Sequence, residues 1–476
     1  MLRDVTTNIT DGLLGLNSNK GDGVHLKIGV SPVISDTPIV ITGNMTATKI
    51  KELLGLSPLA DKVMDSIENG SSRIYCIPVS ASTAGSRSTV EKIATGSGSL
   101  SVSGNPYNAF NVIIKITGQG RRNSALFIYS IDGGYSYSDE LTVPLTGQYE
   151  IPLTGLTITF TEGAESDVET SFLVGDVFKF KTTAPTMTNS DALASIDKLK
   201  YFNEYYELVH IVGESQKALW SAVSEQQVVL ATSYHKPLLF VLEAYAPDDN
   251  ENVSAYAQRL EADKKDVKNT DIQVVAARSL YIGMDGITRE INNAGIVCGL
   301  YSKSEVHQSI GKTRDTSGMG ISKTKMLELR PNGIEEYIEL LDTAKYLTFR
   351  SYDGLDSFFV TNARVMSPEG SDYRYAEDVR VKNKIIREVR KEALQLLQDD
   401  IDLEDVQNEL ETRAKFMQTP LDDMVKLKEI TSATITVLEG QDIIMTEKMS
   451  IVIRYVSRGY IREIEVDLGR TKPSSD

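Results

Sequence analysis

The sequence predicts an α/β core, a mostly parallel sheet with flanking helices, that carries an inserted all-β domain and precedes an α+β C-terminal domain. Three observations predict this class. Continuous apolar runs typical of buried strands alternate with helical periodicity before residue 80 and after residue 185. Between these points only short strand patterns separated by turn residues occur. After residue 370 a long amphipathic helix precedes further strands, and both chain ends are expected to form extended arms.

The α/β core is assigned to residues 24–80 and 186–370, so it is a discontinuous domain. Its strand patterns are too continuous in apolar residues to leave one face in water, which is typical of a sheet covered on both sides. The predicted strands are 24–30, 38–42, 73–79, 207–213, 238–242 and 272–276. Helical periodicity marks 48–69, 191–202, 215–232 and 253–264, with Ser190 as a suitable N-cap for the second of these.

The inserted domain is assigned to residues 81–185. It begins where the composition shifts to Ser, Gly, Ala and Thr, and Asp132-Gly133-Gly134 is a strong turn between two of its strands. The predicted strands are 112–117, 125–130, 141–143, 156–160 and 177–180. Short strands at this spacing indicate a β-sandwich or a small barrel.

The C-terminal α+β domain is assigned to residues 371–460. It begins with an amphipathic helix over 377–398, whose apolar stripe includes Val381, Ile385 and Val389. The acidic residues 399–411 are expected to continue in a second helix. Strands are predicted at 433–437, 449–456 and 461–468. The two arms are residues 1–23 and 461–476.

Composition bounds the classes of function. The chain has 476 residues, of which 41% are hydrophobic, so it suits a globular protein of two to four domains. A formal net charge of −16 argues against nucleic acid as a main partner, because phosphate binding needs a basic surface. Cys76 and Cys298 lie in apolar runs and are expected to be buried, reduced thiols. No apolar stretch is long enough for membrane insertion, and the first residues lack the apolar core of a signal peptide.

Motifs that carry chemistry are nearly absent from the sequence. Gly311-Lys312-Thr313 resembles the end of a phosphate-binding loop, but Val306 stands where that loop needs a glycine. The histidines have no paired metal spacing, and His210 is expected to be a hydrogen-bonded core residue. We therefore expect no catalytic, cofactor-binding or metal-binding residue and no cofactor, and we expect that the protein is not an enzyme.

The last predicted strand alternates strictly between two kinds of side chain. Ile464, Val466 and Leu468 share one face, and Glu463, Glu465 and Asp467 share the other. Such a strand needs one covered face and a neighbour with which to pair. Two interpretations remain open: an edge strand of its own domain, or a strand donated to the sheet of another subunit.

Four basic residues recur at helical spacing in the helix predicted over 377–398. Arg380, Lys384, Arg387 and Lys391 follow the spacing i, i+4, i+7 and i+11, so they share one helical face. A solvated basic face is the ordinary interpretation. In an acidic protein the same face could also dock on an acidic partner.

Three segments resemble contractile tail sheath proteins of phages and related injection machines. They are ENGSSRIYCIPV (68–79), NAGIVCGLYSKSEVHQSIGKT (293–313) and, most strongly, LTFRSYDGLDSFFVTNARVMSPEGSDYRYAEDVRVKNKI (347–385). The last combines a strand and turn, a second strand with Asn362-Ala363-Arg364-Val365, and an aspartate–tyrosine segment that leads into a basic helix. The order of arm, core, insert, basic helix and C-terminal sheet is also similar to that family.

The resemblance implies a homo-oligomer of stacked hexameric rings around an inner tail tube protein, with baseplate and tail terminator proteins as further partners. Each arm would join a sheet of a neighbouring subunit, and the sheath would shorten irreversibly to drive the tube through an envelope. The resemblance assigns the arm contacts to Val5, Thr6 and Ile9 and to Ile464, Val466 and Leu468. The basic face at Arg380, Lys384, Arg387 and Lys391 is the candidate tube-facing surface.

The resemblance also implies where the protein is located, and two alternative functions remain open beside it. The protein would belong to a virion tail and assemble in the cytoplasm of a host bacterium, with the β insert at the periphery. Another tail structural protein, of tube or baseplate, is an alternative. A different class of alternative is an α/β enzyme with a carbohydrate-binding β insert.

Overall fold

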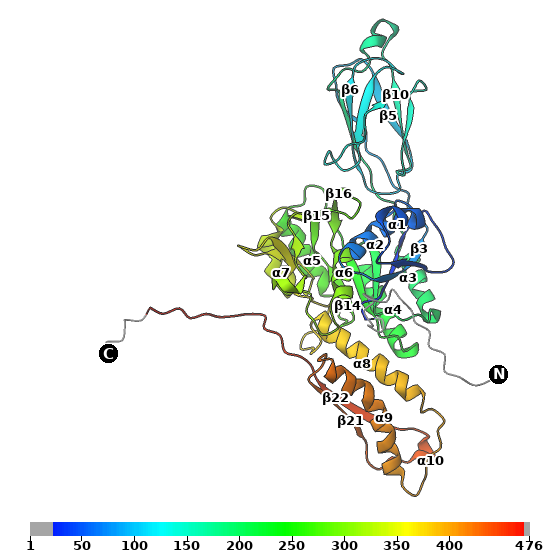
Figure 1. The fold of residues 1–476 in the computed structure, drawn as a ribbon, viewed down its shortest axis with the longest axis vertical. Coiled ribbons are helices and arrows are strands. Elements are labelled where there is room, and N and C mark those ends of the chain that lie inside the picture. Colours follow the sequence, from blue (N-terminus) through cyan, green and yellow to red (C-terminus); the bar gives the residue numbers. More distant parts are fainter. Residues whose placement is uncertain (1–21, 471–476) are drawn as a thin grey trace, which may run out of the picture. The chain divides into compact units, whose positions relative to one another are not determined.

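The computed structural model describes residues 22–470. The chain divides into two compact units, of which the first ends at Ala376 and the second begins at Glu377 (Figure 1). Val5, Thr6 and Ile9, the residues expected in the N-terminal arm, lie outside the described part of the chain.

A six-stranded sheet of order β14-β13-β12-β1-β3-β2 forms the centre of the first unit. All neighbours in it are parallel except β2, which runs antiparallel to β3. Every residue of β1 and β13 is buried, including the polar His25 and Lys27 of β1. The strands are β1 (His25–Val30), β2 (Ile39–Thr42), β3 (Arg73–Val79), β12 (Leu208–Ser215), β13 (Leu239–Ala244) and β14 (Ile272–Val275).

Two helices, α2 (Pro58–Glu68) and α6 (Ala294–Lys303), pack closely against each other beside this sheet. Ser57 caps α2 by accepting a hydrogen bond from the Ala60 amide, and Pro58 stands where no amide is needed. A Cβ on Gly295 or Gly299 would lie under 3.0 Å from atoms of α2, so only glycine permits this approach. The other helices of the core are α1 (Ala47–Leu54), α3 (Asn189–Asp197), α4 (Lys217–Ser233) and α5 (Val253–Lys264).

Two small antiparallel sheets complete the core of the first unit. One has the order β16-β15-β18, and the other the order β17-β20-β19. Gly311-Lys312-Thr313 lies in a loop between α6 and β17, without the strand-to-helix junction that a phosphate-binding loop requires. The elements are β15 (Arg278–Ile282), β16 (Thr288–Asn292), β17 (Ile321–Ser322), β18 (Met326–Arg330), α7 (Ile338–Thr343), β19 (Phe349–Ser351) and β20 (Ser357–Val360).

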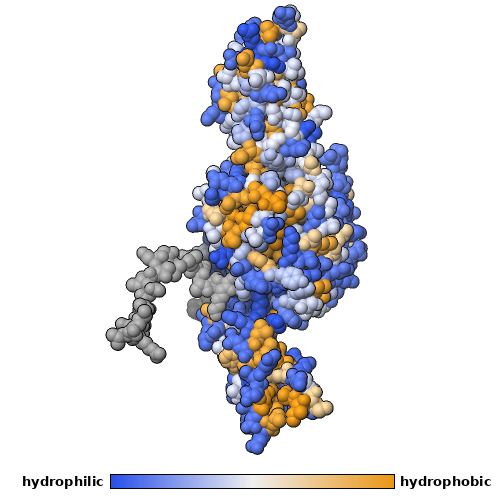
Figure 2. Space-filling view, turned by 90° about the vertical axis from the view of Figure 1, so that its right-hand side faces the viewer, coloured by the Kyte–Doolittle hydropathy of each residue, from blue (hydrophilic) through white to orange (hydrophobic). Residues whose placement is uncertain are grey.

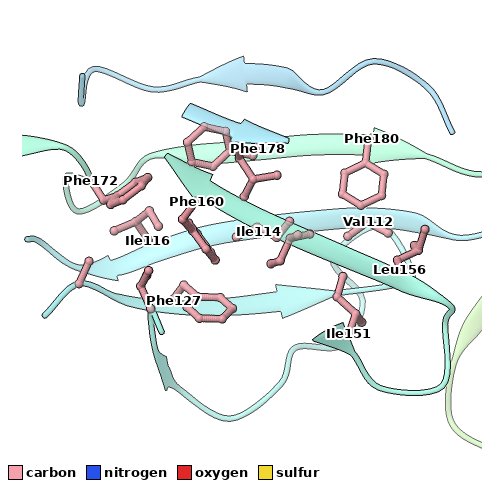
Figure 3. Packing of buried hydrophobic residues seen from close by; sticks show 14 of the residues in the cluster. Val112, Ile114, Ile116, Phe127, Ile151, Leu156, Phe160, Phe172, Phe178 and Phe180 are labelled. Carbon is pink, nitrogen blue, oxygen red and sulfur yellow. The ribbon is translucent and has the colours of Figure 1, made fainter. Parts of the chain in front are cut away.

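The insert is a β-sandwich between β3 and α3. A sheet of order β5-β10-β9 faces a sheet of order β4-β11-β6-β7-β8. Figure 3 shows the aromatic side chains between them, where Phe160 packs edge-on against Phe172 with ring centroids 5.4 Å apart. The strands are β4 (Glu91–Ile93), β5 (Ser99–Gly104), β6 (Asn111–Gly118), β7 (Leu126–Ser130), β8 (Leu141–Thr142), β9 (Gln148–Ile151), β10 (Leu156–Thr161) and β11 (Val177–Lys181).

The second unit combines two long helices with a hairpin. Its elements are α8 (Ala376–Leu394), α9 (Val406–Lys426), β21 (Ser432–Val437), α10 (Ile443–Thr446) and β22 (Ile451–Val456). α8 ends earlier than the sequence predicts, and Gln398 adopts a left-handed φ of 67°. The expectation of helix over 399–411 is wrong for its first half. Aspartate is a poor helix former, and α9 begins only after the run of acidic residues that ends at Asp405.

Candidate functional site

The hairpin β21–β22 packs one face on α9 and exposes the other. Ile435 pairs with Ile453, and Val437 pairs with Ile451. Ile435, Val437 and Ile451 belong to an apolar cluster with Leu410 of α9. The opposite face presents the exposed hydroxyls of Ser432, Thr434 and Thr436. The hairpin thus has the one-sided burial of a sheet that is supported by a helix.

The hairpin forms a two-stranded sheet in the described chain, so each strand has an outer edge without a neighbouring strand. Backbone groups of successive residues in a strand point alternately to its two sides. The amide of Leu438, directly after β21, donates to the carbonyl of Ser450, directly before β22 (3.4 Å). Ala433 and Ile435 lie an odd number of positions before Leu438, so their backbone groups point the opposite way, to the outer edge of β21.

The outer edge of β21 is occupied in part by Gln418 of α9. The Gln418 side chain donates from Nε2 to the Ala433 carbonyl (3.0 Å) and accepts at Oε1 from the Ile435 amide (2.9 Å). Beside it lies a groove of about 520 Å³ between α9 and β21. The groove is lined by Gln407, Glu411, Ala414, Lys415, Gln418, residues 433–437 and Glu439.

The segment that follows the hairpin forms no strand between residues 461 and 470. Ile464, Val466 and Leu468 are 78%, 79% and 96% exposed. The prediction of a third strand over 461–468 is thus wrong for the single chain. A strand needs a neighbour to pair its backbone and cover its apolar face, and within residues 377–470 no strand lies beside this segment.

The base of this segment is held by an ion pair. Arg462 donates from Nη2 to Oε1 of Glu377 (2.6 Å), and the Glu377 carboxylate is buried, with 1% of its side chain exposed. The Arg462 guanidinium also lies 5.3 Å from the ring centroid of Tyr460. Burial raises the pKa of Tyr460, and the nearby carboxylates of Glu377 and Asp378 raise it further. These contacts hold the start of the segment, at Tyr460 and Arg462, against the second unit.

The expected basic face on α8 is not an exposed surface. Arg380 is fully buried, and Lys384 is 8% exposed and donates to the Glu429 carboxylate (2.7 Å). The guanidinium nitrogens of Arg387 are buried, and Lys391 alone of the four residues is exposed. The expectation of a tube-facing surface is wrong for Arg380 and Lys384, which are buried, whereas Arg387 is partly buried. Helical spacing shows that the four basic residues share one face of α8, but it does not show that Glu429 of the same chain pairs with Lys384.

A buried polar network crosses the central sheet of the first unit. Lys27 Nζ lies 2.7 Å from Nδ1 of His210, and His210 Nε2 lies 3.0 Å from Oε1 of Glu243. The Lys27 ammonium can only donate, so Nδ1 of His210 accepts and its Nε2 donates to the carboxylate. The prediction that His210 is a hydrogen-bonded core residue is confirmed.

The ionisation of this network follows from its burial. Burial, together with the adjacent Lys27, lowers the pKa of His210 to about 3. Burial alone would raise the pKa of Glu243, but Lys62 and the hydrogen bond from His210 outweigh it and bring the pKa to about 2. Burial raises the pKa of Asp65 to about 7. Burial also raises the pKa of Cys76 to about 12, so this thiol stays protonated at neutral pH.

Residues 22–470 offer neither a metal centre nor a membrane-spanning helix. They contain no group of three or more His, Cys, Asp or Glu side chains arranged to hold a metal ion. No helix in that part of the chain is both long enough and apolar enough to cross a bilayer. The hairpin edge, the groove and the exposed C-terminal segment are therefore the candidate site.

Comparison with family models matches nearly the whole chain. The N-terminal domain of DUF2586 matches residues 2–364, and its C-terminal domain matches residues 372–475. The chain belongs to the DUF2586 family. No curated protein matches this DUF2586 chain.

Solved structures identify the fold of this DUF2586 chain. A sheath tail protein from Desulfitobacterium hafniense has a TM-score of 0.50 at 12% identity, covering 96% of this chain and 100% of its own. The PVC sheath complex of an extracellular contractile injection system, in its contracted state, contains a chain with a TM-score of 0.52 at 10% identity, covering 98% and 99%. A chain of the contracted anti-feeding prophage baseplate has a TM-score of 0.52 at 13% identity, covering 98% of both chains. The resemblance to the sheath fold is confirmed.

Sequence reasoning found the exposed segment at Ile464, Val466 and Leu468 but missed Gln418 and the ion pair of Arg462 with Glu377. The strict alternation of the segment is a signal that a single sequence carries. A glutamine or an arginine in a polar stretch is common, and nothing in the sequence distinguishes these two from others.

Proposed function

We propose that this protein is the structural subunit of a contractile tail sheath. It polymerises around an inner tube as stacked hexameric rings and contracts to drive the tube through a cell envelope. One observation supports this proposal above all. The chain has the sheath fold, and its C-terminal segment carries an apolar face that is exposed to solvent. This segment directly follows a hairpin whose two outer edges have no neighbouring strand in the described chain.

Strand donation between subunits links the rings in this proposal. A donated segment forms about five ladder bonds of roughly 1 kcal/mol each. Its three aliphatic side chains contribute roughly 1.5–3 kcal/mol each when buried, and ordering about eight residues costs roughly 1–2 kcal/mol each. These terms nearly cancel, so one arm binds weakly and only several linked contacts hold a subunit. Such a subunit therefore assembles cooperatively above a critical concentration and stays dispersed below it.

The proposed partners follow from the same role. Copies of this chain form the rings, an inner tube protein lies within them, and baseplate and tail terminator proteins bound the polymer. The particle is a virion tail that assembles in the cytoplasm of a host bacterium. Of the four basic residues on α8, only Lys391 is exposed and remains a proposed tube contact. The arm role of Val5, Thr6 and Ile9 also stays a proposal.

Electron microscopy of the purified protein tests the proposal. We expect wide hollow tubes or stacked rings from the full chain, and dispersed subunits after deletion of residues 461–476. An enzyme would instead give discrete particles. Tubes of unchanged yield and form after the deletion would show that the C-terminal segment does not link subunits.

A further inference from the structure

We propose that Gln418 is a removable cap on the outer edge of β21, and that residues 463–468 of a second copy displace it when subunits join. This inference rests on the proposed sheath function and identifies the edge that receives the donated strand. The Gln418 side chain bonds both the Ala433 carbonyl and the Ile435 amide, which are the outward groups that a neighbouring strand would use.

A side-chain amide suits this role because it can be replaced without loss. It supplies one donor and one acceptor, as the backbone of an added strand does. When that strand takes over both bonds, the freed Gln418 amide can still donate to Oδ1 of Asp422, which it already contacts at 2.9 Å. Gln418 is only partly buried, so the released side chain also reaches water.

The groove beside β21 fits the C-terminal segment of a second copy. β21 has six residues, and the alternating part of the segment, 463–468, is equally long. A strand placed on this edge continues the two faces of the hairpin. Ile464, Val466 and Leu468 then extend the apolar face of Ile435 and Val437 over α9.

The charges of the two surfaces are compatible with this placement. Glu463, Glu465 and Asp467 would lie on the exposed face, next to the hydroxyls of Thr434 and Thr436. Arg454 of β22 lies on the same exposed face, paired with Thr434, while the groove on the α9 side is lined by Lys415 and by Glu411 and Glu439. The acidic side chains of the segment therefore point away from the carboxylates of the groove and keep their contact with water, and none is buried unpaired.

The cap also explains how a free subunit avoids premature assembly. An uncapped strand edge pairs readily with other chains. Gln418 occupies two of the outward groups of β21 until a strand arrives with its own apolar contacts. Removal of the cap should therefore make self-association easier. Removal of a residue that stabilises the interface would make self-association harder, so the direction of the effect distinguishes the two roles.

The first test compares Gln418→Met with Gln407→Met in the full chain. Both positions lie on α9 beside the groove, but Gln407 binds Glu411 (3.1 Å) and not the strand. We expect Gln418→Met to lower the critical concentration for polymer about tenfold, the effect of two lost competing hydrogen bonds. We expect Gln407→Met to leave it unchanged. An unchanged or raised critical concentration for Gln418→Met overturns the proposal.

Hydrogen exchange at the Ile435 amide gives a second readout. It should be slow in the free wild-type subunit, fast in the free Gln418→Met subunit, and slow in the polymers of both. Fast exchange in the Gln418→Met polymer would show that no strand occupies this edge. Should Gln418→Met unfold, Gln418→Glu retains the acceptor for the Ile435 amide and, of the two bonds to β21, loses the one to the Ala433 carbonyl, together with the bond to Asp422, so a smaller drop in critical concentration is expected.

Disulfide formation identifies the occupant. Thr434→Cys and Glu465→Cys are made in separate chains and mixed, because the native Cys76 and Cys298 are buried. A crosslinked dimer in the polymer supports the proposal. A dimer formed with Thr6→Cys in place of Glu465→Cys would assign the edge to the N-terminal segment and overturn the inference while leaving the sheath function intact. Absence of any wild-type polymer would refute the proposed function itself.

Discussion

At the scale of single residues, the buried network in the first unit makes stability depend on pH in two opposing ways. The pKa of His210 is about 3 in the folded chain, so below its unfolded value near 6.5 only the unfolded chain binds this proton. Stability is lost as the pH falls through this range. The pKa of Asp65 is raised to about 7, so between about pH 4 and pH 7 only the folded chain binds that proton. Its contribution to stability grows as the pH falls.

Substitution of Asp65 by asparagine removes the second effect and leaves the first. We expect the free energy of unfolding of Asp65→Asn, relative to wild type, to fall by about 1.4 kcal/mol per pH unit between about pH 7 and pH 4. The side chain faces Lys62, Asp61, Arg289 and Lys27, and asparagine keeps its volume. Urea unfolding at a series of pH values measures the difference. Asp249→Asn, at an exposed loop position, is the control and should follow wild type. Parallel curves for Asp65→Asn and wild type would contradict the prediction.

The ion pair at the base of the C-terminal segment gives a second prediction at this scale. Arg462→Ala removes a partner of the buried Glu377 carboxylate, whereas the side chain of Arg462 itself is 26% exposed. We expect the second unit to lose about 1–3 kcal/mol of stability, less than for a fully buried pair. Chemical denaturation followed by a probe in this unit measures it. Arg462→Lys should recover part of the loss, and Arg458→Ala, at an exposed position nearby, should have little effect.

At the scale of elements, sequence patterns correctly predicted the strands that are buried by contacts within the same chain. The strands at 73–79 and 238–242 are buried in one sheet, and their apolar runs report that burial directly. The alternating pattern at 461–468 predicts a buried apolar face, but in the single chain this face is exposed. The basic residues of α8 were misread because their spacing says nothing about Glu429, which follows α9 and pairs with Lys384. Sequence alone shows which face an element offers, and tertiary contacts decide what covers it.

The exposed segment gives a prediction that separates folding from assembly. The triple change Ile464→Ser, Val466→Ser and Leu468→Ser should leave the stability of the free subunit unchanged, because these side chains are exposed in it. The same change should abolish polymer, since each lost aliphatic contact is worth roughly 1.5–3 kcal/mol in an assembled lattice. Thermal unfolding and electron microscopy measure the two effects. Glu463→Gln, Glu465→Gln and Asp467→Asn, on the opposite face, form the matched control and should retain tubes. Polymer from the serine variant would show that the apolar face is not buried between subunits.

At the scale of the whole molecule, apolar surface is distributed unevenly over the chain. Figure 2 shows apolar side chains gathered at the tip of the second unit, where the loop of the hairpin carries α10. Ile444 and Met445 are 68% and 80% exposed there. Exposed apolar patches of this kind mark surfaces that meet other chains. The second unit thus has exposed apolar surface both at this tip and along the C-terminal segment, and Figure 2 shows a further apolar patch on the first unit.

The insert is by contrast a finished domain, and its removal should leave assembly intact. It has its own apolar core, and its two ends are already joined by backbone hydrogen bonds between Thr83 and Thr186 (3.0 and 2.9 Å). We expect a chain in which Asn-Gly replaces residues 84–185 to fold, because this dipeptide closes a hairpin between antiparallel residues. The core loses the hydrogen bond that Asn108 donates to Asp61 (2.6 Å), so the change in stability should stay below about 2 kcal/mol. Electron microscopy should show tubes with the same ring spacing and a smaller outer diameter. Loss of tubes from a folded variant would show that the insert takes part in the contacts between subunits.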